Sequence, residues 1–491
     1  MAVFLPTVPT PTVGRAMTAP TPTSLPHLSG RFCIYTYGCQ MNEHDSEKMA
    51  SLLQQMGLQA VAEPEAADVI ILNTCSVREK AGQKVFSELG KLRLVKRRRP
   101  HMVIAVCGCL AQQEGERIFR QAPHVDVVFG PRNIPELPEL LRRVVQGERH
   151  VASLSRPRQR PAFDQLAIYR RSLVVGYVTI MEGCDKFCTF CIVPFTRGRE
   201  TYRPPRDILA EVQALAEAGY QEVVLLGQTV NSYRWEDVTF AALLRMIHDI
   251  EGIRRIRFVS PHPSDVTDEL IETMRDYPKI CRHIHLPLQA GSDRILRAMR
   301  RTYTQEEYLE KVEKLRRAIP DIAIGTDIIV GFPGETEEDF QETLWVVRLV
   351  EYDHMFSFKY SPRPFTAAWK FGDPVSDEVK TDRIVRLQAL QEEIQLRKHR
   401  AFLGSLQEVL FEGPSKRRPE ELEGRTTHNR VVNVPADPSR WLGRFAWVRI
   451  TEAGPHSLRG ELIEEDRLTG LRSSLERPQS LDPETPSRFG P

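Results

Sequence analysis

Long apolar runs, a strong net charge and a dense set of cysteines are all missing from this sequence of 491 residues. No apolar run is long enough to cross a bilayer, which predicts a soluble protein with no membrane partner. The formal net charge is only +2, so bulk charge gives no evidence of a nucleic-acid partner, and any basic surface must be local. The nine cysteines are odd in number and scattered. That distribution disfavours a disulfide framework and favours reduced thiols that bind metal in the cytoplasm.

Acidic side chains are also absent from residues 1–29, which are rich in Pro and Thr and carry one Arg, Arg15. The apolar opening is interrupted by proline and has no charged n-region, so we expect no secretory signal. We interpret residues 1–29 and the polar residues 467–491 as disordered tails. An organellar targeting segment is the alternative for the first tail, because such segments are poor in acids.

Three cysteines stand just past an apolar run, Val174–Ile180, that we expect to be a buried strand. Cys184, Cys188 and Cys191 have C-x3-C-x2-C spacing within EGCDKFCTFCIVPFTRGRE, residues 182–200. A structural zinc site needs four ligands, and no fourth Cys or His stands nearby in the sequence. A four-iron, four-sulfur cluster held by three thiolates leaves one iron open for a small molecule. We therefore predict such a cluster, with a zinc knuckle or a disulfide loop as the alternative.

Strands and helices alternate over residues 30–151, which we predict to form one domain. An alternating βα series favours a parallel, doubly wound sheet of flavodoxin-like type, in an α/β protein of several domains. The expected strands are Phe32–Tyr37, Val69–Leu72, Met102–Val106 and Val125–Phe129, with helices such as Asp45–Met56 between them.

Three further cysteines follow the ends of three of these strands. Cys39, Cys75 and Cys109 are separated by 36 and 34 residues, about one βα unit each. Because parallel strands bring their carboxyl ends to one edge of a sheet, where open α/β sheets bind ligands, we predict a second three-thiolate cluster there. The alternative is that each is a buried packing residue, which is common for free cysteine.

The other three cysteines are predicted to be packing residues. Cys33 lies inside a strand and Cys281 precedes one. Cys107 lies two residues before Cys109 and is the other candidate for the third ligand of the second cluster. We prefer Cys109, because it lies past a turn glycine. The run KLRLVKRRRP, residues 91–100, holds six basic side chains, which indicates a solvated helix end, with an RNA-facing patch as the alternative.

A basic, proline-marked linker is predicted at residues 152–172, and longer βα units follow over residues 173–402. Six units, rather than the eight that close a barrel, predict a partial TIM-type (β/α)6 barrel with ligand groups at the carboxyl ends of its strands. The expected strands are Val174–Ile180, Glu222–Leu226, Ile256–Val259, His283–Leu288, Ile322–Val330 and Met355–Tyr360, with helices such as Asp207–Ala218 and Glu337–Val350 between them.

Glycine and polar residues follow most of these strands. They are Gly227, Gln228, Asn231, Ser260, His262, Gln289 and the GFPGET loop at residues 331–336. Thr336 and the acids after it are equally well explained as a helix cap. His285 lies inside an apolar strand, where a satisfied core histidine is the commoner case and a functional group the alternative.

Short β-prone segments separated by Gly and Pro follow over residues 403–466. This pattern predicts a small antiparallel β-barrel. The segments are Leu406–Glu412, Arg425–Val434, Arg444–Ile450 and Ser457–Leu462. Two basic clusters, Lys416–Arg418 and Arg425–Arg430, indicate phosphate contact.

Six motifs spread over nearly the whole ordered chain resemble the methylthiotransferase family of radical S-adenosylmethionine enzymes. They are TYGCQMNEHDSEKM, NTCSVREKA, EGCDKFCTFCIVPFTRGRE, HLPLQAGSDRIL, DIIVGFPGETEEDF and GRTTHNRVVN. Within the family they resemble the branch that modifies tRNA, because Gln40 stands where the branch that modifies a ribosomal protein carries proline. Two positions depart from the branch: Thr229, where asparagine is expected, and Phe365, where glycine is usual.

The resemblance implies a cluster domain, a radical domain and a carboxyl-terminal TRAM barrel. It assigns an auxiliary four-iron cluster to Cys39, Cys75 and Cys109, and the radical cluster to Cys184, Cys188 and Cys191. We predict contacts with S-adenosylmethionine from Phe190, Gly227, Gln228, Asn231, Ser260 and His285. For RNA we predict contacts from Arg197, Arg199, Arg425 and Arg430.

The implied activity is methylthiolation of carbon 2 of N6-isopentenyladenosine beside the tRNA anticodon. Side-chain acids and bases cannot usefully activate that C–H bond, so the clusters supply the reactivity and no acid–base residue is predicted. The expected partners are a tRNA anticodon loop, an electron donor such as flavodoxin or ferredoxin, and a sulfur source, with the chain itself a monomer. The alternatives are another tRNA adenosine, a ribosomal protein, or a non-catalytic iron–sulfur sensor that binds RNA.

Overall fold

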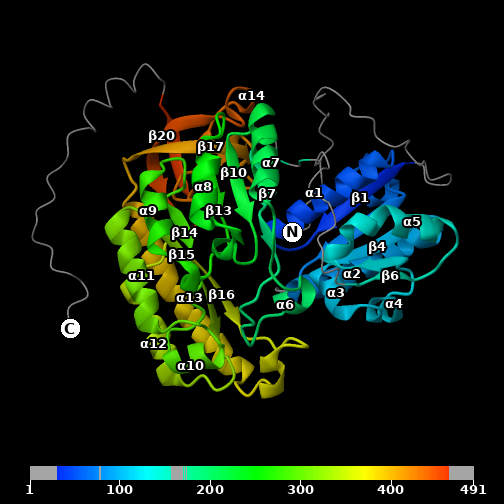
Figure 1. Cartoon of the computed structure of the whole chain (residues 1–491), viewed down its shortest axis with the longest axis horizontal. Helices are drawn as coiled ribbons and strands as arrows, with labels where there is room; N and C mark the ends of the chain where they lie inside the picture. Colours follow the sequence, from blue (N-terminus) through cyan, green and yellow to red (C-terminus); the bar gives the residue numbers. More distant parts are fainter. Residues whose placement is uncertain (1–29, 77–78, 156–169, 171, 173, 464–491) are drawn as a thin grey trace, which may run out of the picture. The chain divides into compact units, whose positions relative to one another are not determined.

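The structure, a computed structural model, describes residues 30–76, 79–155, 170, 172 and 174–463 (Figure 1). The predicted tails and most of the predicted linker lie outside these residues. The chain divides into two units, residues 1–395 and 396–491. Within the described part of the chain, no helix is both long and apolar enough to cross a membrane.

The amino-terminal part of the first unit is a parallel sheet with the strand order β2-β1-β3-β4-β5-β6. This order confirms the flavodoxin-like sheet. The strands are β1 (Arg31–Thr36), β2 (Gln59–Ala60), β3 (Val69–Thr74), β4 (Val103–Gly108), β5 (Val127–Phe129) and β6 (Val151–Ser153). The helices are α1 (Gln40–Gln55), α2 (Glu79–Arg98), α3 (Cys109–Glu114), α4 (Arg117–Gln121) and α5 (Leu137–Val145). The short strands β2 and β6 were not predicted, because neither forms an apolar run.

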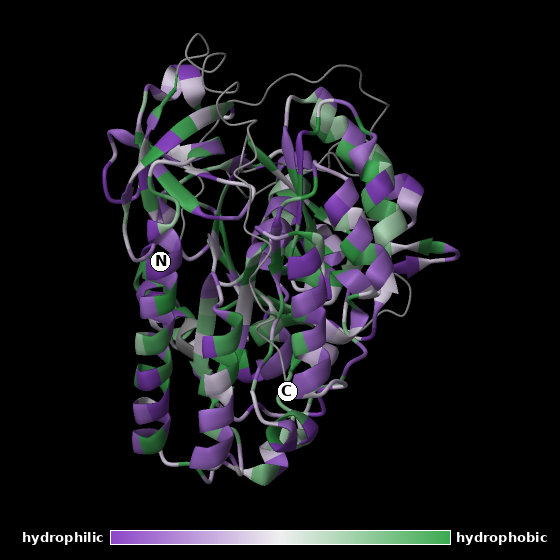
Figure 2. Cartoon of the chain, turned by 90° about the vertical axis from the view of Figure 1, so that its left-hand side faces the viewer, coloured by the Kyte–Doolittle hydropathy of each residue, from purple (hydrophilic) through white to green (hydrophobic). Residues whose placement is uncertain are grey.

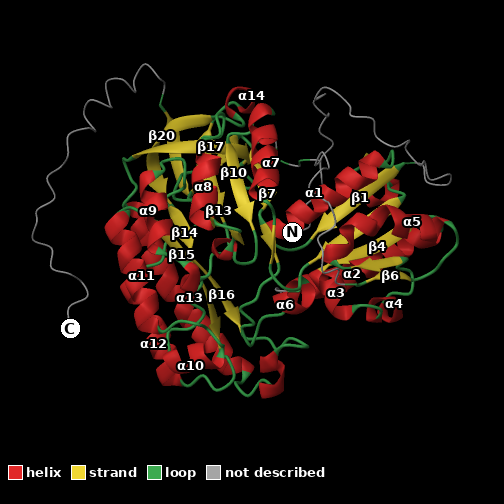
Figure 3. Ribbon diagram, in the orientation of Figure 1, coloured by secondary structure: helices red, strands yellow, loops and turns green. Residues whose placement is uncertain are grey.

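Helices cover both faces of this sheet, as Figure 3 shows. Every residue of β3 and of β4 is therefore buried, which explains why both read as continuous apolar runs. Strand β1 sends alternate side chains into two separate cores. Phe32 and Ile34 pack in one core, and Cys33 and Tyr35 in the other.

The central part of the first unit contains six parallel strands in two sheets, ordered β13-β10-β7 and β14-β15-β16. An isolated parallel bridge pairs Ile256 of β13 with Ile280, in the segment that leads into β14. This arrangement confirms the partial barrel. The strands are β7 (Val175–Thr179), β10 (Glu222–Leu226), β13 (Arg255–Phe258), β14 (His283–His285), β15 (Ala323–Val330) and β16 (His354–Lys359). The helices are α6 (Val193–Thr196), α7 (Pro205–Glu217), α8 (Phe240–His248), α9 (Asp268–Asp276), α10 (Asp293–Ala298), α11 (Gln305–Ala318), α12 (Glu337–Val350) and α13 (Asp377–Arg400).

Helix α12 illustrates how the helices around the barrel strands are capped and packed. Thr336 caps it by accepting a hydrogen bond from the Asp339 backbone N–H, while the Asp339 carboxylate accepts one from the Thr336 N–H. Its buried face, which includes Phe340 and Val347, packs in the core of the barrel. In Figure 2 hydrophilic and hydrophobic residues interleave along the outer helices, as expected for helices with one buried face.

Strand β14 is shorter than predicted. It ends at His285, whereas the apolar run continues to Leu288. Pro287 has no backbone N–H to donate to the neighbouring strand, so the regular ladder stops before it. The chain nevertheless continues beside β15, because the Gln289 N–H donates to the Asp327 carbonyl at 2.9 Å.

The second unit contains a closed five-stranded barrel in the order β17-β18-β19-β21-β20, which confirms the predicted small barrel. Its strands are β17 (Leu406–Pro414), β18 (Glu421–Arg425), β19 (Val431–Pro435), β20 (Phe445–Ala453) and β21 (Leu458–Leu462). The prediction of one strand over Arg425–Val434 is wrong. That segment crosses a tight turn in which the Thr426 N–H donates to the Arg430 carbonyl at 3.1 Å. Asn429 permits the turn by adopting a φ of +63°, in the left-handed region that asparagine tolerates.

We predict that Gly108→Ala destabilises the amino-terminal sheet more than Gly57→Ala does. Both glycines have a φ near +90°, so both substitutions carry the roughly 1 kcal/mol cost of a left-handed alanine. A Cβ at Gly108 would also overlap the carbonyl oxygen of Thr74, whereas a Cβ at Gly57 meets nothing within 4 Å. Thermal denaturation of both variants measures the difference. Equal midpoints would show that the close approach of β4 to β3 is dispensable.

Candidate active site

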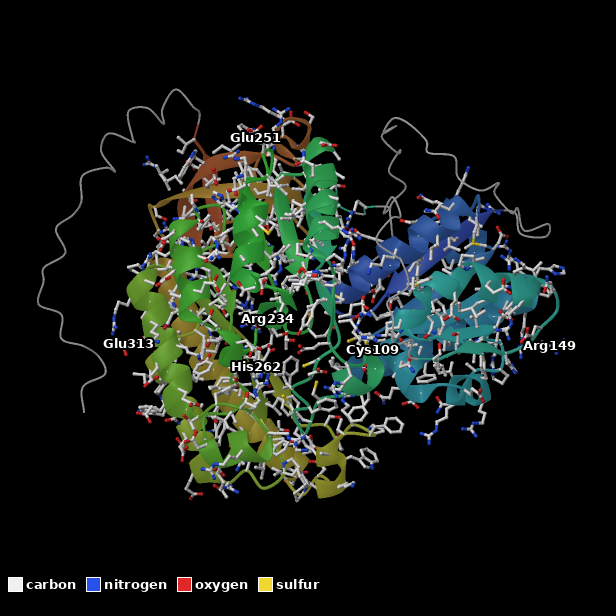
Figure 4. The ribbon with its side chains drawn as sticks, viewed as in Figure 1. Cys109, Arg149, Arg234, Glu251, His262 and Glu313 are labelled. Carbon is white, nitrogen blue, oxygen red and sulfur yellow. The ribbon has the colours of Figure 1, made fainter. Side chains whose placement is uncertain are left out.

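The three cysteines predicted for the auxiliary cluster lie at one edge of the amino-terminal sheet. Cys39 precedes α1, Cys75 follows β3, and Cys109 is the first residue of α3. Strands β1, β3 and β4 are direct neighbours, so the three loops meet. The loops also pack tightly, since a Cβ at Gly38 would lie 2.9 Å from the Cβ of Cys75. In Figure 4 Cys109 lies on the side of this sheet that faces the central strands.

A buried pair of asparagines holds two of these loops together. The Asn42 side-chain amide donates to Asn73 Oδ1 at 3.0 Å, and the Asn73 amide donates to the Asn42 carbonyl at 2.8 Å. Both residues are fully buried. Asn42 Oδ1 also lies 3.5 Å from Cys39 Sγ, from which it accepts a hydrogen bond. This pair ties the first turn of α1 to the end of β3. The pair was not predicted from the sequence, although Asn42 and Asn73 lie within three residues of Cys39 and Cys75.

A buried ion pair lies beside the same cysteines. Arg197, which follows α6, donates to Asp45 of α1 at 2.7 Å, and the two side chains are only 4% and 2% exposed. Burial raises the pKa of the Cys109 thiol, and the nearby Arg197 charge lowers it. Arg197 was predicted to contact RNA; in the structure its buried side chain pairs with Asp45, whose opposite charge compensates the burial, and a contact with RNA stays a prediction.

The cysteines predicted to be packing residues are all buried. Cys107 is fully buried in the same core as Phe32, and burial raises the pKa of its thiol well above the usual value. Cys33 lies in the other core of the sheet, and Cys281 is 2% exposed. None of the nine cysteines, all of which lie in the described part of the chain, forms a disulfide bond.

The C-x3-C-x2-C loop lies between β8 (Met181–Glu182) and α6. Its backbone folds back on itself, because the Cys191 N–H donates to the Cys188 carbonyl at 2.9 Å. The three side chains lie near one another. Burial raises the pKa of the Cys191 thiol to about 12, and the charges of Cys188 and Cys184 also raise it. Burial likewise raises the pKa of Cys184 to about 11.

The donors around this loop fit an iron–sulfur cluster. Two of the sulfurs accept hydrogen bonds: Cys188 Sγ from Arg301 Nη1 at 3.4 Å, and Cys184 Sγ from the Lys186 N–H at 3.5 Å. Soft thiolates with N–H donors directed at the sulfur are the ligand chemistry of such clusters. Among the residues that the structure describes, no three His, Cys, Asp or Glu side chains could hold a single metal ion. A four-iron cluster does not need three side chains to converge on one ion, because each thiolate binds a different iron atom.

Glu200 anchors the loop to the barrel. Its carboxylate accepts hydrogen bonds from the Asp185 N–H at 3.1 Å, from the Thr229 hydroxyl at 3.0 Å and from the Ser232 hydroxyl at 3.2 Å. Thr229, one of the two departures from the family pattern, therefore has a defined partner. Gln228, predicted to contact the cofactor, accepts from the Gly183 N–H at 2.5 Å and so holds the start of the cysteine loop.

Asn231 and His262 join the ends of two neighbouring strands. The Asn231 amide donates to the His262 carbonyl at 2.9 Å and accepts from the His262 N–H at 2.7 Å. Burial lowers the pKa of His262 to about 2, and the charges of Arg301 and Lys186 lower it further, so the ring is neutral. Ser260 adopts a φ of +58° just after β13. Of the other predicted cofactor contacts, Phe190 packs partly buried against the barrel core, and Gly227 lies tightly against Met181.

His285 belongs to a chain of polar side chains on the neighbouring strands. Its Nδ1 lies 3.2 Å from His354 Nε2, and its Nε2 lies 3.1 Å from Asp327 Oδ1. Gly325 makes this arrangement possible, because a Cβ there would overlap the His354 ring. The His285 ring also lies 5.9 Å from the ring of Phe356, whose side chain is 52% exposed. Sequence reasoning did not connect these residues, since they come from three strands.

The remaining arginines predicted to contact RNA differ in exposure. The side chain of Arg199 is 72% exposed, pairs with Asp185 at 2.6 Å and lies over the Phe187 ring. In the carboxyl-terminal barrel, Arg430 is buried with its guanidinium 4.6 Å from the Phe402 ring centroid. Arg425 is half-buried and lies 3.5 Å from Glu412. Contacts of Arg199, Arg425 and Arg430 with RNA stay predictions.

Comparison with known proteins defines the class of the central domain. Residues 178–344 match the model of the Radical SAM superfamily, residues 31–130 that of the Uncharacterized protein family UPF0004, and residues 400–463 that of the TRAM domain. The radical S-adenosylmethionine methyltransferase TsrM from Kitasatospora setae aligns with 74% of this chain and 75% of its own at a TM-score of 0.50. With 14% identity, that likeness shows the fold alone. The central domain is a radical SAM domain.

Closer relatives define the family. The tRNA-2-methylthio-N(6)-dimethylallyladenosine synthase of Alkalilimnicola ehrlichii is 49% identical over 445 residues, which cover 89% of this chain and 99% of that protein. The proteins of the same name from Finegoldia magna and Aeromonas hydrophila are 48% and 47% identical over 88% and 91% of this chain, and over 94% of each relative. The chain belongs to the tRNA-2-methylthio-N(6)-dimethylallyladenosine synthase family, which confirms the resemblance seen in the sequence.

We predict that Asn73→Ala weakens the auxiliary site and spares the radical site. The substitution removes the Asn73 Oδ1 acceptor of the buried Asn42 amide, which keeps only the Thr74 carbonyl at 3.3 Å, and it removes the hydrogen bond from Asn73 to the Asn42 carbonyl, at a cost of about 1–3 kcal/mol. The loops that carry Cys39 and Cys75 are then no longer joined by the hydrogen bonds between Asn42 and Asn73. Iron analysis of the reconstituted variant should show a loss of about one cluster, while cleavage of S-adenosylmethionine continues. Retention of full iron content would contradict this role for the pair.

We predict that Arg197→Met destabilises the first unit strongly. It leaves Asp45 as an uncompensated buried charge, and breaking a buried pair in this way costs about 3–5 kcal/mol. Denaturant unfolding measures the loss. Arg275→Met is the matched control, because the Arg275–Asp276 pair is exposed and should contribute little. Similar unfolding curves for the two variants would show that the pair at Arg197 is not stabilising.

Proposed function

We propose that this protein transfers a methylthio group to carbon 2 of N6-dimethylallyladenosine in tRNA. The observation that carries the proposal is the presence of two three-cysteine sites, one at the edge of the flavodoxin-like sheet and one on the loop of the radical SAM domain. Relatives named for this reaction are 48–49% identical to this chain over 94–99% of their own lengths. Two four-iron clusters and S-adenosylmethionine are the cofactors.

Each group of residues has a task in this scheme. The clusters and S-adenosylmethionine supply the radical chemistry and carry the sulfur, neither of which side chains provide. Cys184, Cys188 and Cys191 would hold the radical cluster, and Arg301 donates a hydrogen bond to Cys188 Sγ. Glu200 and Gln228 fix the loop that carries these cysteines. Asn231 fixes the position of His262 at the carboxyl end of the barrel strands.

The substrate must reach both cysteine sites. An adenosine stacked inside a helix cannot do so, which favours an unpaired base that leaves the stack, as in an anticodon loop. The neutral His262 and the polar strand ends form the surroundings that such a base meets. In this proposal an electron donor such as flavodoxin or ferredoxin reduces the radical cluster, and a separate source supplies the sulfur. The protein acts in the cytoplasm as a monomer.

The experiment is an anaerobic reaction of the reconstituted protein with reductant, S-adenosylmethionine and prenylated tRNA. Nucleoside masses of the digested tRNA should show an adenosine with a methylthio group in place of a hydrogen atom. Cys109→Ala should abolish this product but still form 5′-deoxyadenosine, whereas Cys184→Ala should abolish both.

Cys281→Ala is the control, since it removes a buried thiol that no cluster needs and should keep both products. If the parent protein forms 5′-deoxyadenosine and leaves the tRNA unchanged, the assignment of the substrate is wrong. If it forms neither product while holding iron and binding tRNA, the chain is a sensor and not an enzyme.

A further inference from the structure

Three large aromatic side chains are exposed together on the loop after β16. Phe365 is 63% exposed, Trp369 51% and Phe371 50%. Trp369 and Phe371 belong to the short helix η6 (Ala367–Phe371), and Phe365 lies just before it. Isolated exposed apolar residues are ordinary, but aromatic side chains of this size usually stabilise a core. A group of them within one short segment therefore marks a contact surface.

The backbone at Phe365 adds an independent observation. Its φ is +70°, in the left-handed region that favours glycine and costs another residue about 1–3 kcal/mol. Phe365 gains little from burial to offset this strain, because most of its side chain is exposed. A strained backbone that presents an exposed ring is expected where the ring has a function.

The base of the loop is rigid although its rings are exposed. Thr366 is buried and its hydroxyl donates to the Arg363 carbonyl at 2.7 Å. Ala368 is fully buried, and its carbonyl accepts from the Tyr360 hydroxyl at 3.1 Å. The rings are therefore held outward by a fixed scaffold, so ordering them on a ligand costs less entropy than ordering a mobile loop would.

The loop is attached directly to the radical site. The Ala368 N–H donates to the Thr189 carbonyl at 2.8 Å, and Thr189 lies between Cys188 and Cys191. A substrate base that reaches these cysteines must bring its neighbouring nucleotides close to this loop. Lys370 is exposed between Trp369 and Phe371, so the surface combines π-faces with a positive charge. That combination is the chemistry with which proteins bind single-stranded nucleic acids.

We propose that Phe365, Trp369 and Phe371 form a stacking surface for the unpaired bases that flank the reacting adenosine. This inference rests on the proposed function, because it takes an RNA substrate as given. Every base has a π-face, so the surface holds the strand without reading its sequence. Phe365, Trp369 and Phe371 act as substrate-positioning residues and take no part in the chemistry.

The test uses the full chain with both clusters reconstituted. The probes are two anticodon stem-loop RNAs, one with N6-dimethylallyladenosine and one with unmodified adenosine. The variants are Trp369→Ala and Phe365→Gly, of which the second also relieves the backbone strain and should therefore fold. The matched control is Trp345→Ala, since the Trp345 ring is 49% exposed on α12. The dissociation constant of each protein is measured at several salt concentrations.

Each variant should weaken binding of both RNAs by about 5- to 150-fold, the range for loss of one stacked base. The slope of affinity against salt should stay unchanged, because stacking releases no counterions from phosphates. In turnover, the KM for RNA should rise while kcat changes little. The control should behave as the parent does.

Four results would overturn the inference. If both variants bind RNA as the parent does and the parent is active on tRNA, the loop is not a stacking surface, and the proposed function stands. A loss confined to the prenylated RNA assigns the surface to the dimethylallyl group instead. An equal loss in Trp345→Ala shows that the effect is not specific to this loop. A parent protein that neither binds nor modifies RNA overturns the proposed function, and this inference with it.

Discussion

The ion pair between Arg197 and Asp45 is the contact on which the arrangement of the two cysteine sites depends. Arg197 follows the loop of Cys191, and Asp45 lies on the helix that Cys39 begins. Neither charge is stable without water unless the other is present. Two further buried pairs reach α1 from the central part of the chain: Lys48 with Glu182, and Arg170 with Glu47. Arg170 and Arg203 also pair with Glu211 of α7. Burial raises the pKa of Glu211, but the guanidinium groups of Arg203 and Arg170 lower it more and hold it below its usual value. The two sites are thus positioned by matched charges, which specify one arrangement more sharply than apolar contact does.

The sequence was sufficient to predict features that depend on local pattern. Parallel strands buried on both faces read as apolar runs, and the cysteines after them fall at one sheet edge for topological reasons alone. Features that depend on pairing between distant residues were out of reach. Asn42 and Asn73 are 31 residues apart, and nothing in either segment shows that their amides meet. Arg197 was predicted to contact RNA because it stands beside the cysteine loop in the sequence. Its partner stands 152 residues earlier, so the sequence could not show the pairing.

Glycine has a consistent role at the radical site. Gly183 has a φ of +84°, and a Cβ there would overlap the carbonyl of Arg199. Gly325 leaves room for the His354 ring, and Gly227 for Met181. Phe365 is the opposite case, in which a large ring occupies a backbone conformation suited to glycine. Close packing therefore explains the glycines of this site, and it does not explain Phe365.

The two cysteine sites differ in how their ligands are distributed along the chain. Cys184, Cys188 and Cys191 lie within one loop, so their thiolates can gather before the barrel is complete, at a small loss of chain entropy. Cys39, Cys75 and Cys109 come from three loops and meet only when β1, β3 and β4 have paired. A cluster held by these three cysteines would therefore assemble only with the folded sheet, and its binding energy would contribute to the stability of that domain. The radical site could thus bind iron before the barrel is complete, whereas the auxiliary site needs the paired strands of the folded sheet.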